Sequence, residues 1–260
     1  SDNIILEFFE VKGEVKMKYK RILLKVSGGA LSGDKDFGFE KNALDKITDE
    51  IIKASDKGVE IAVLIGGGNI FRGRTAEDWN IERAEADNIG MMATVINSLI
   101  LRGALVSKGA HDLRVMTAIP MDTVAEPYIR LRALHHLDKG KIVVFGGGIG
   151  QPYVTTDYAT LQRALEIRAD VVLMAKQGTD GVYTDNPNEN PNAKRYKTLS
   201  YDEAISKNLK VVDQSAFILA QDYDMPMYIF DFNQKNSILD VCEGKNIGTY
   251  VGNNCDIEMY

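Results

Sequence analysis

The chain has 260 residues, of which 45% are apolar and 26% are charged, and its formal net charge is −6. This length is enough to bury the core of one large α/β domain. The acidic balance argues against a nucleic acid partner, which needs a basic surface, although one pocket for a small polyanion can still be basic. No apolar run approaches the ~20 residues that span a bilayer, so we expect no membrane contact.

Cysteine and histidine are too scarce and too scattered for a metal centre. The two cysteines, Cys242 and Cys255, lack CxxC spacing, and none of the three histidines lies in an HExxH pattern. We expect no disulfide framework and no metal held by His or Cys ligands. A reducing, cytoplasmic location fits this composition.

The first 16 residues differ from the rest. The apolar stretch at residues 4–9 is interrupted by an acid and lacks a basic leader, which makes a poor signal peptide. Met17 precedes a Lys-Tyr-Lys-Arg run that resembles a natural start. We interpret residues 1–16 as a leader or extension, with an N-terminal packing segment as the alternative. Residues 17–260 are interpreted as a single domain.

Further along, short apolar runs alternate with helical periodicity. The runs at residues 22–26, 61–65, 142–145 and 171–174 are nearly continuous, as in parallel strands that are buried on both faces. This order predicts an α/β fold, a three-layer αβα sandwich around a mainly parallel sheet. The turn-rich residues 186–192 predict an exposed loop or an irregular hairpin. The helical stripes consist of Leu44, Ile47 and Ile51, and of Ile89, Met92, Ile96 and Leu99.

Three glycine clusters, at residues 28–29, 66–68 and 146–150, each follow a predicted strand. In a parallel sheet these positions lie at the carboxyl ends of the strands, where ligands bind. Glycine lets backbone N–H groups approach a phosphate, although glycine also simply makes tight turns. Three clusters at equivalent strand ends favour phosphate binding over plain turns.

Familiar nucleotide-binding motifs are absent from these clusters. Gly28 and Gly33 have P-loop spacing, but Asp34 stands where the lysine should be. Neither of the later clusters completes G-x-G-x-x-G, because Phe71 and Gln151 occupy the last position. The chain is therefore neither a Walker-type NTPase nor a convincing dinucleotide binder.

Charged residues accompany the glycine clusters. Lys25 ends the first strand and can either extend to solvent or reach a phosphate. Arg72 follows the second cluster and could pair with phosphate oxygens through its planar guanidinium group. Thr155, Thr156 and Asp157 open a helix after the third cluster, where they can serve as an N-cap, and the carboxylate can also hold a catalytic lysine. Phosphoryl transfer needs this kind of inventory, because it requires positioning and charge neutralisation rather than a His or Cys nucleophile.

An ordered series of motifs resembles the bacterial uridylate kinases of the amino acid kinase family, from Tyr19 to Thr249. The matching segments are residues 19–28, 65–73, 86–94, 151–157, 169–173, 180–183 and 209–213. The resemblance implies transfer of a phosphoryl group from Mg²⁺-ATP to UMP. It also implies an acceptor lobe toward the N-terminal half and an ATP lobe toward the C-terminal half.

The resemblance also implies roles for individual residues. Lys25 and Asp157 would form the catalytic pair, assisted by Arg72. The ATP site would comprise Lys25, Val26, Ser27, Gly28, Gly68, Arg72, Gln177, Tyr183 and Asn186. The UMP site would comprise Gly67, Asp87 on the ribose, Ile149, Gly150, Gln151, Pro152, Tyr153, Val154, Thr155 and Thr156.

Assembly and regulation follow from the same resemblance. It implies a homohexamer, inhibition by UTP and activation by GTP, with Arg102, Arg114 and Lys141 as the candidate GTP site. Mg²⁺ would be carried by ATP, without a dedicated protein site. Gly29, Ile149, Gln177 and the 185–187 segment depart from the usual family residues, and the last two bear on the adenosine site.

Two other functions compete with UMP phosphorylation. Carbamate, acetylglutamate and aspartate kinases share the fold, so a carboxylate or carbamate acceptor is the enzymatic rival. A non-catalytic nucleotide-binding or storage relative is the rival from another class, because fold does not fix function.

Overall fold

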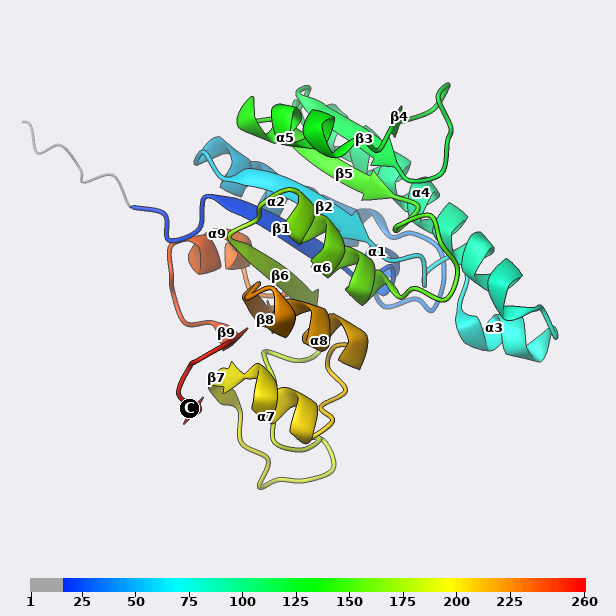
Figure 1. Ribbon diagram of the computed structural model, residues 1–260. Helices are drawn as coiled ribbons and strands as arrows, with labels where there is room; N and C mark the ends of the chain where they lie inside the picture. The colour runs from blue at the N-terminus through cyan, green and yellow to red at the C-terminus, as the bar shows by residue number, and fades with distance from the viewer. Residues whose placement is uncertain (1–15) are drawn as a thin grey trace, which may run out of the picture.

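The computed structural model describes residues 16–260, so the interpretation of residues 1–15 as part of a leader lies outside the described residues. Within the described part, ten strands form one sheet (Figure 1). The strands are β1 (Arg21–Val26), β2 (Glu60–Ile65), β3 (Leu113–Thr117), β4 (Glu126–Pro127), β5 (Ile142–Gly146), β6 (Val171–Lys176), β7 (Tyr196–Ser200), β8 (Met227–Asp231), β9 (Gly248–Gly252) and β10 (Glu258–Met259).

The sheet has the order β10-β7-β9-β8-β6-β1-β2-β5-β3-β4, and neighbouring strands are parallel except in the β8–β9 and β7–β10 pairs. The four predicted strands are β1, β2, β5 and β6, and all four are almost wholly buried, as their apolar runs predicted. Strands β2 to β5 lie on one side of β1 and strands β6 to β10 on the other. The two halves of the sequence therefore occupy opposite halves of one continuous sheet.

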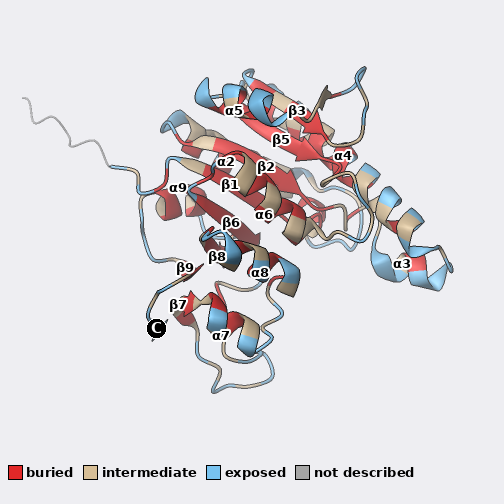
Figure 2. Ribbon diagram, viewed as in Figure 1, coloured by how far each residue is buried: buried red, intermediate tan, exposed pale blue. Residues whose placement is uncertain are grey.

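Helices cover both faces and enclose two apolar cores (Figures 1 and 2), which confirms the predicted αβα sandwich. One core lies under α2 (Lys41–Asp56), α4 (Arg83–Ser107) and α9 (Ser237–Cys242). The other lies under α5 (Arg130–Asp138), α6 (Thr156–Glu166), α7 (Tyr201–Ser206) and α8 (Gln214–Asp222). Two short helices, α1 (Gly29–Ser32) and α3 (Gly73–Asp78), follow β1 and β2 at the carboxyl edge.

The long helix α4 buries only part of the apolar stripe in its sequence, because only Leu99 of the four stripe residues packs against the core. Ile89, Met92 and Ile96 are 38%, 39% and 44% exposed, whereas Ala93 and Leu101 are buried. Small side chains let the helix approach the backbone closely: a Cβ on Gly67 would lie 2.8 Å from the Gly90 carbonyl oxygen. By length and composition alone, α4 could span a membrane, but it packs Leu101 and Leu105 into the core beneath the sheet.

The turn-rich segment after β6 forms the predicted irregular hairpin. Residues 185–189 are exposed, and the two arms meet at an antiparallel bridge between Tyr183 and Arg195. A second bond joins the arms where the Thr184 N–H donates to the Lys194 carbonyl at 2.9 Å.

Candidate functional site

The first two glycine clusters meet at the carboxyl edge of the sheet. β1 and β2 pair in parallel through Val26 and Ile65, so the turns that follow them lie side by side. A Cβ on Gly28 would come within 2.5 Å of the Gly68 nitrogen and 2.7 Å of the Gly66 carbonyl oxygen. Glycine is therefore required at position 28 because backbone fills the space that any side chain would take.

A buried pair of asparagines fixes the second cluster. The Asn97 amide, on α4, donates to the Gly66 carbonyl at 2.7 Å and to Asn69 Oδ1 at 2.7 Å. Asn69 in turn donates to the Gly38 carbonyl at 3.0 Å. Because both side chains are fully buried, their amides must be paired, and this pairing holds the turn after β2 against α4.

The third cluster follows β5 and is attached to the same helix. The Gly147 N–H donates to Thr94 Oγ1, on α4, at 2.8 Å. Gly147, Gly148 and Gly150 have φ values of +75°, +55° and +77°, which residues with a side chain rarely adopt. The second and third clusters are thus bonded to α4, and the first packs against the second, so the three lie together at this edge.

Lys25 and Asp157 form a buried ion pair at this convergence. Lys25 Nζ lies 2.8 Å from Asp157 Oδ1, and the two residues are each 9% exposed. Burial alone would raise the pKa of Asp157, but the charges of Lys25 and Lys176 outweigh it and lower that pKa below its usual value. Thr155 caps α6 by accepting the Tyr158 N–H at 3.2 Å, as predicted, and so places Asp157 in the first turn of that helix.

Two further charged residues complete this pair, and neither was identified from the sequence. Lys176, the last residue of β6, donates to the Val211 carbonyl at 2.5 Å, and burial followed by the charge of Lys25 lowers its pKa. The Asp213 N–H, at the start of α8, donates to Asp157 Oδ2 at 3.2 Å. Lys176 offered the same signal as Lys25, a lysine at the end of an apolar strand, two or three residues before a glycine.

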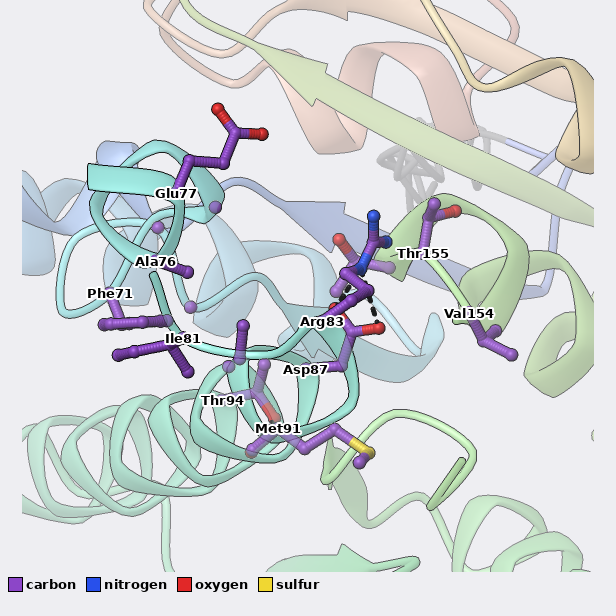
Figure 3. A pocket seen from close by; sticks show the side chains of 16 residues that line it. Phe71, Ala76, Glu77, Ile81, Arg83, Asp87, Met91, Thr94, Val154 and Thr155 are labelled. Atoms are coloured by element: carbon purple, nitrogen blue, oxygen red, sulfur yellow. Dashed lines mark hydrogen bonds and ion pairs between the residues drawn. The ribbon is translucent and has the colours of Figure 1, made fainter. Parts of the chain in front are cut away.

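A cavity of about 550 Å³ opens beside the glycine clusters, within the size range of ligand pockets. Figure 3 shows Asp87 and Arg83 between Phe71 and Ile81 on one side and Val154 and Thr155 on the other. The lining residues are Gly67, Gly68, Phe71, Gly73, Ala76, Glu77, Ile81, Arg83, Ala86, Asp87, Gly90, Met91, Thr94, Val154, Thr155 and Thr156.

Asp87 connects α4 to the segment that opens α6. Its Oδ2 accepts the Tyr153 N–H at 2.7 Å, and both of its oxygens lie 2.9 Å from Arg83 Nε. Tyr153 adopts a left-handed backbone conformation (φ +65°) at this contact. Arg83 was also missed, although its spacing of four residues before Asp87 on one helix was the available signal.

Arg72 contacts the second glycine cluster and the loop at residues 34–38. Its Nε donates to the Gly68 carbonyl at 2.9 Å, and its Nη2 donates to the Asp36 carbonyl at 2.6 Å. Its guanidinium carbon lies 5.1 Å from the centre of the Phe37 ring. The arginine therefore flanks the second glycine cluster and is held by the 34–38 loop.

The three residues expected around adenosine have different surroundings. Gln177 lines a second cavity together with Asn42, Lys46 and Asn233, whereas Asn186 lies at the exposed turn of the hairpin. Tyr183 donates its hydroxyl to Asp180 Oδ1 at 2.7 Å. Of the candidate GTP residues, Arg102 and Arg114 line one cavity near β4, and Lys141 pairs with Asp112 at 3.9 Å outside it.

Comparison with known proteins agrees with this architecture. A model of the amino acid kinase family matches residues 20–231. The uridylate kinase of Frankia alni is 54% identical over 234 residues, which cover 90% of this chain and 91% of that protein. The UMP kinase structure from Bacillus anthracis has a TM-score of 0.91 at 50% identity, covering 93% of this chain and 99% of that one. The UMP kinase structure from Ureaplasma parvum has a TM-score of 0.85 at 35% identity, covering 91% and 100% respectively.

The chain therefore belongs to the amino acid kinase family. Within that family, its relatives from Frankia, Bacillus and Ureaplasma are uridylate kinases.

Proposed function

We propose that the protein transfers the γ-phosphoryl group of Mg²⁺-ATP to UMP, giving ADP and UDP in pyrimidine nucleotide synthesis. The buried Lys25–Asp157 pair at the meeting point of three glycine clusters carries this proposal. A fixed, desolvated lysine beside the phosphate-binding turns stabilises the charge of a transition state most strongly. A protein that only stores nucleotides does not need such a lysine, so the pair favours a catalytic function. The uridylate kinase relatives support UMP as the acceptor.

The acceptor side of the reaction would use the 550 Å³ cavity. Thr155 and Thr156 lie at the N-terminus of α6, where free N–H groups and the helix dipole favour an anion. Asp87 would accept hydrogen bonds from the ribose hydroxyls. The proposed UMP contacts remain those named from the sequence: Gly67, Asp87 and residues 149–156.

The donor side would use the ammonium groups of Lys25 and Lys176. Charge accumulates on the transferred phosphoryl group and on the leaving oxygen of ADP as the bond from the γ-phosphorus breaks and an oxygen of the UMP phosphate attacks. Lys25 would meet that charge, with Asp157 holding the lysine in place. The proposed ATP contacts comprise residues 25–28 with Gly68, Arg72, Gln177, Tyr183 and Asn186.

Mg²⁺ fits this site as a companion of ATP. Within residues 16–260, no group of three or more His, Cys, Asp or Glu side chains forms a metal cage. Mg²⁺ typically binds through substrate phosphates and water with one or two carboxylates, so a site of this kind does not require such a cage. When bound, the ion neutralises charge on the ATP phosphates.

An acceptor screen with Mg²⁺-ATP tests the proposed function. UMP should be converted to UDP. CMP should react at least ~100-fold more slowly, because its 4-amino group and unprotonated N3 present the opposite hydrogen-bonding groups to those of uracil. Carbamate and acetylglutamate should be slower by at least the same factor, since a site built for a nucleotide leaves its polar groups unpaired around a smaller substrate. Preference for carbamate or acetylglutamate would identify the carboxylate-kinase alternative. Tight ATP binding with no UDP formed would identify the storage alternative.

Asp87→Ala should weaken UMP binding by about tenfold or more, because it removes a charged acceptor for the ribose and frees the Tyr153 segment. The affinity for ATP should change little, since the Lys25 side of the site keeps its contacts. Isothermal titration with each nucleotide measures both effects. Glu85→Ala, an exposed acid two residues earlier on α4, is the matched control. Equal UMP affinity in Asp87→Ala and wild type would refute the assigned role.

Assembly, regulation and location are part of the same proposal. The exposed apolar face of α4 around Ile89, Met92 and Ile96 supports association into the homohexamer implied by the resemblance. Arg102 and Arg114, which line one cavity, support GTP as an activator, with UTP as an inhibitor. Light scattering tests the assembly, and a lack of any rate change with GTP would refute the activation. We place the protein in the cytoplasm.

A further inference from the structure

Arg163, in the last turn of α6, is a buried cation that none of the roles above explains. It is only 4% exposed, and burying a guanidinium costs free energy unless every donor finds a partner. Its Nη1 donates to Glu166 Oε2 at 2.6 Å, and its Nη2 donates to the Gly148 carbonyl at 3.1 Å. Its guanidinium carbon lies 3.6 Å from the centre of the Tyr128 ring. The arginine thus joins the helix to the third glycine cluster.

A built cage holds Arg163 in this orientation. The Tyr128 hydroxyl donates to the Glu166 carboxylate, and Gln162 Nε2 donates to Glu166 Oε1 at 3.1 Å. Tyr128 also packs edge-on against Phe145 of β5, with ring centres 5.5 Å apart. Burial alone would raise the pKa of Glu166, but the hydrogen bonds from Tyr128 and Arg163 outweigh it and lower that pKa, so the carboxylate stays charged.

The bond to Gly148 acts on a turn that could otherwise change conformation. Gly147, Gly148 and Gly150 all have positive φ, and glycine populates the alternative wells almost as readily. Thr94 holds the Gly147 N–H on one side of the turn, and Arg163 holds the Gly148 carbonyl on the other. Because a trans peptide is planar, fixing the Gly148 carbonyl toward Arg163 aims the Ile149 N–H in the opposite direction.

We propose that Arg163 is a positioning residue that locks the 147–150 turn in the conformation that receives the acceptor nucleotide. This inference rests on the proposed UMP site, to which residues 149–156 belong. The contacts with Glu166 and Tyr128 offset the cost of burying the guanidinium group. Its second terminal nitrogen, Nη2, then holds the Gly148 carbonyl and fixes the conformation of the turn. The proposed donor site lies at the other end of α6, where Asp157 pairs with Lys25, and Nη2 of Arg163 makes no hydrogen bond to it.

Arg163→Lys is the sharpest test, because it keeps the charge but replaces the two-armed fork with one nitrogen that cannot occupy both positions. The KM for UMP should rise about tenfold, as expected when a charged hydrogen bond no longer holds the turn, while the KM for ATP stays within about twofold. Hydrogen exchange of the 146–150 amides should be faster than in wild type. Arg168→Met, which removes an exposed cation just past the same helix, is the control and should behave as wild type.

Two outcomes would overturn the inference. A folded Arg163→Lys protein with an unchanged KM for UMP would show that the turn does not need the arginine. A loss shared equally by UMP and ATP would reduce Arg163 to a purely structural role. If Arg163→Lys does not fold, Tyr128→Phe keeps the ring and removes one hydroxyl from the cage, and its KM for UMP alone should rise about threefold. No rise would equally refute the inference. Wild-type protein in the same assay separates these results from failure of the proposed function, which would leave UMP unphosphorylated in every sample.

Discussion

Lys25→Ala should lower kcat at least ~100-fold while UMP binding survives. Lys25 is 9% exposed and lies 2.8 Å from the carboxylate of Asp157, so its ammonium group is fixed and poorly solvated before any substrate arrives. A fixed cation in a dry site stabilises the charge that develops during phosphoryl transfer more than it stabilises the ground state. The effect should therefore fall on kcat rather than on the KM for UMP.

Steady-state kinetics and nucleotide titration together measure this prediction. Lys25→Met should give the same result with less loss of packing. In both variants the nearby charge of Lys176 still stabilises the Asp157 carboxylate. Lys41→Ala removes a lysine whose side chain is 86% exposed and serves as the control for loss of charge. Turnover near the wild-type rate in either Lys25 variant would exclude this lysine from the chemistry.

The four central strands of the sheet, β6, β1, β2 and β5, were predictable because the information for them is local. Continuous apolar runs such as residues 61–65 can be satisfied only when both faces of a strand are buried, and the glycines after them mark where each strand must turn. Periodicity was less informative on α4, where Ile89, Met92 and Ile96 lie on the exposed side. In this half of the helix, Gly90 and Ala93 instead approach the turn after β2 so closely that position 67 has no room for a side chain. A sequence pattern identifies an apolar face but not which surface covers it.

The candidate site was only partly predictable, because it depends on contacts between distant segments. Lys25 and Asp157 could be paired from the resemblance, and the structure brings them together. The contribution of Lys176 depends on the parallel pairing of β1 with β6, which places two strand-end lysines at one edge. Arg163 gave no signal, since an arginine on a helix is usually solvated, and only the fold brings Gly148 and Tyr128 to it.

Lys176 should set the alkaline limit of activity. Burial, and then the nearby charge of Lys25, lower its pKa below the usual 10.5, although Asp157 and Asp213 oppose the shift. A lowered pKa means that Lys176 loses its proton at a lower pH than a solvated lysine does. The pH profile of kcat/KM should therefore fall on the alkaline side below pH 10.5, as the second cation of the site is lost.

Two substitutions separate this explanation from alkaline unfolding. Lys176→Met should lower kcat about 10-fold to 100-fold at neutral pH, because one of two cations is missing from the transition state. Lys176→Arg keeps a charge that does not titrate in this range, so its alkaline limb should move to higher pH. An identical limb in wild type and Lys176→Arg would assign the titration to another group.

Stability should change in the opposite direction over the same pH range. Lys176 has a lower pKa in the folded protein than in the unfolded chain. At pH values between these two pKa values the unfolded chain binds more protons. The contribution of Lys176 to the free energy of unfolding therefore rises with pH. Denaturant unfolding of wild type and Lys176→Met across this range measures that contribution as the difference between their slopes. If activity falls while the contribution of Lys176 to the free energy of unfolding rises, the activity is lost because a catalytic charge is lost. Alkaline unfolding driven by Lys176 would instead require that contribution to fall with pH.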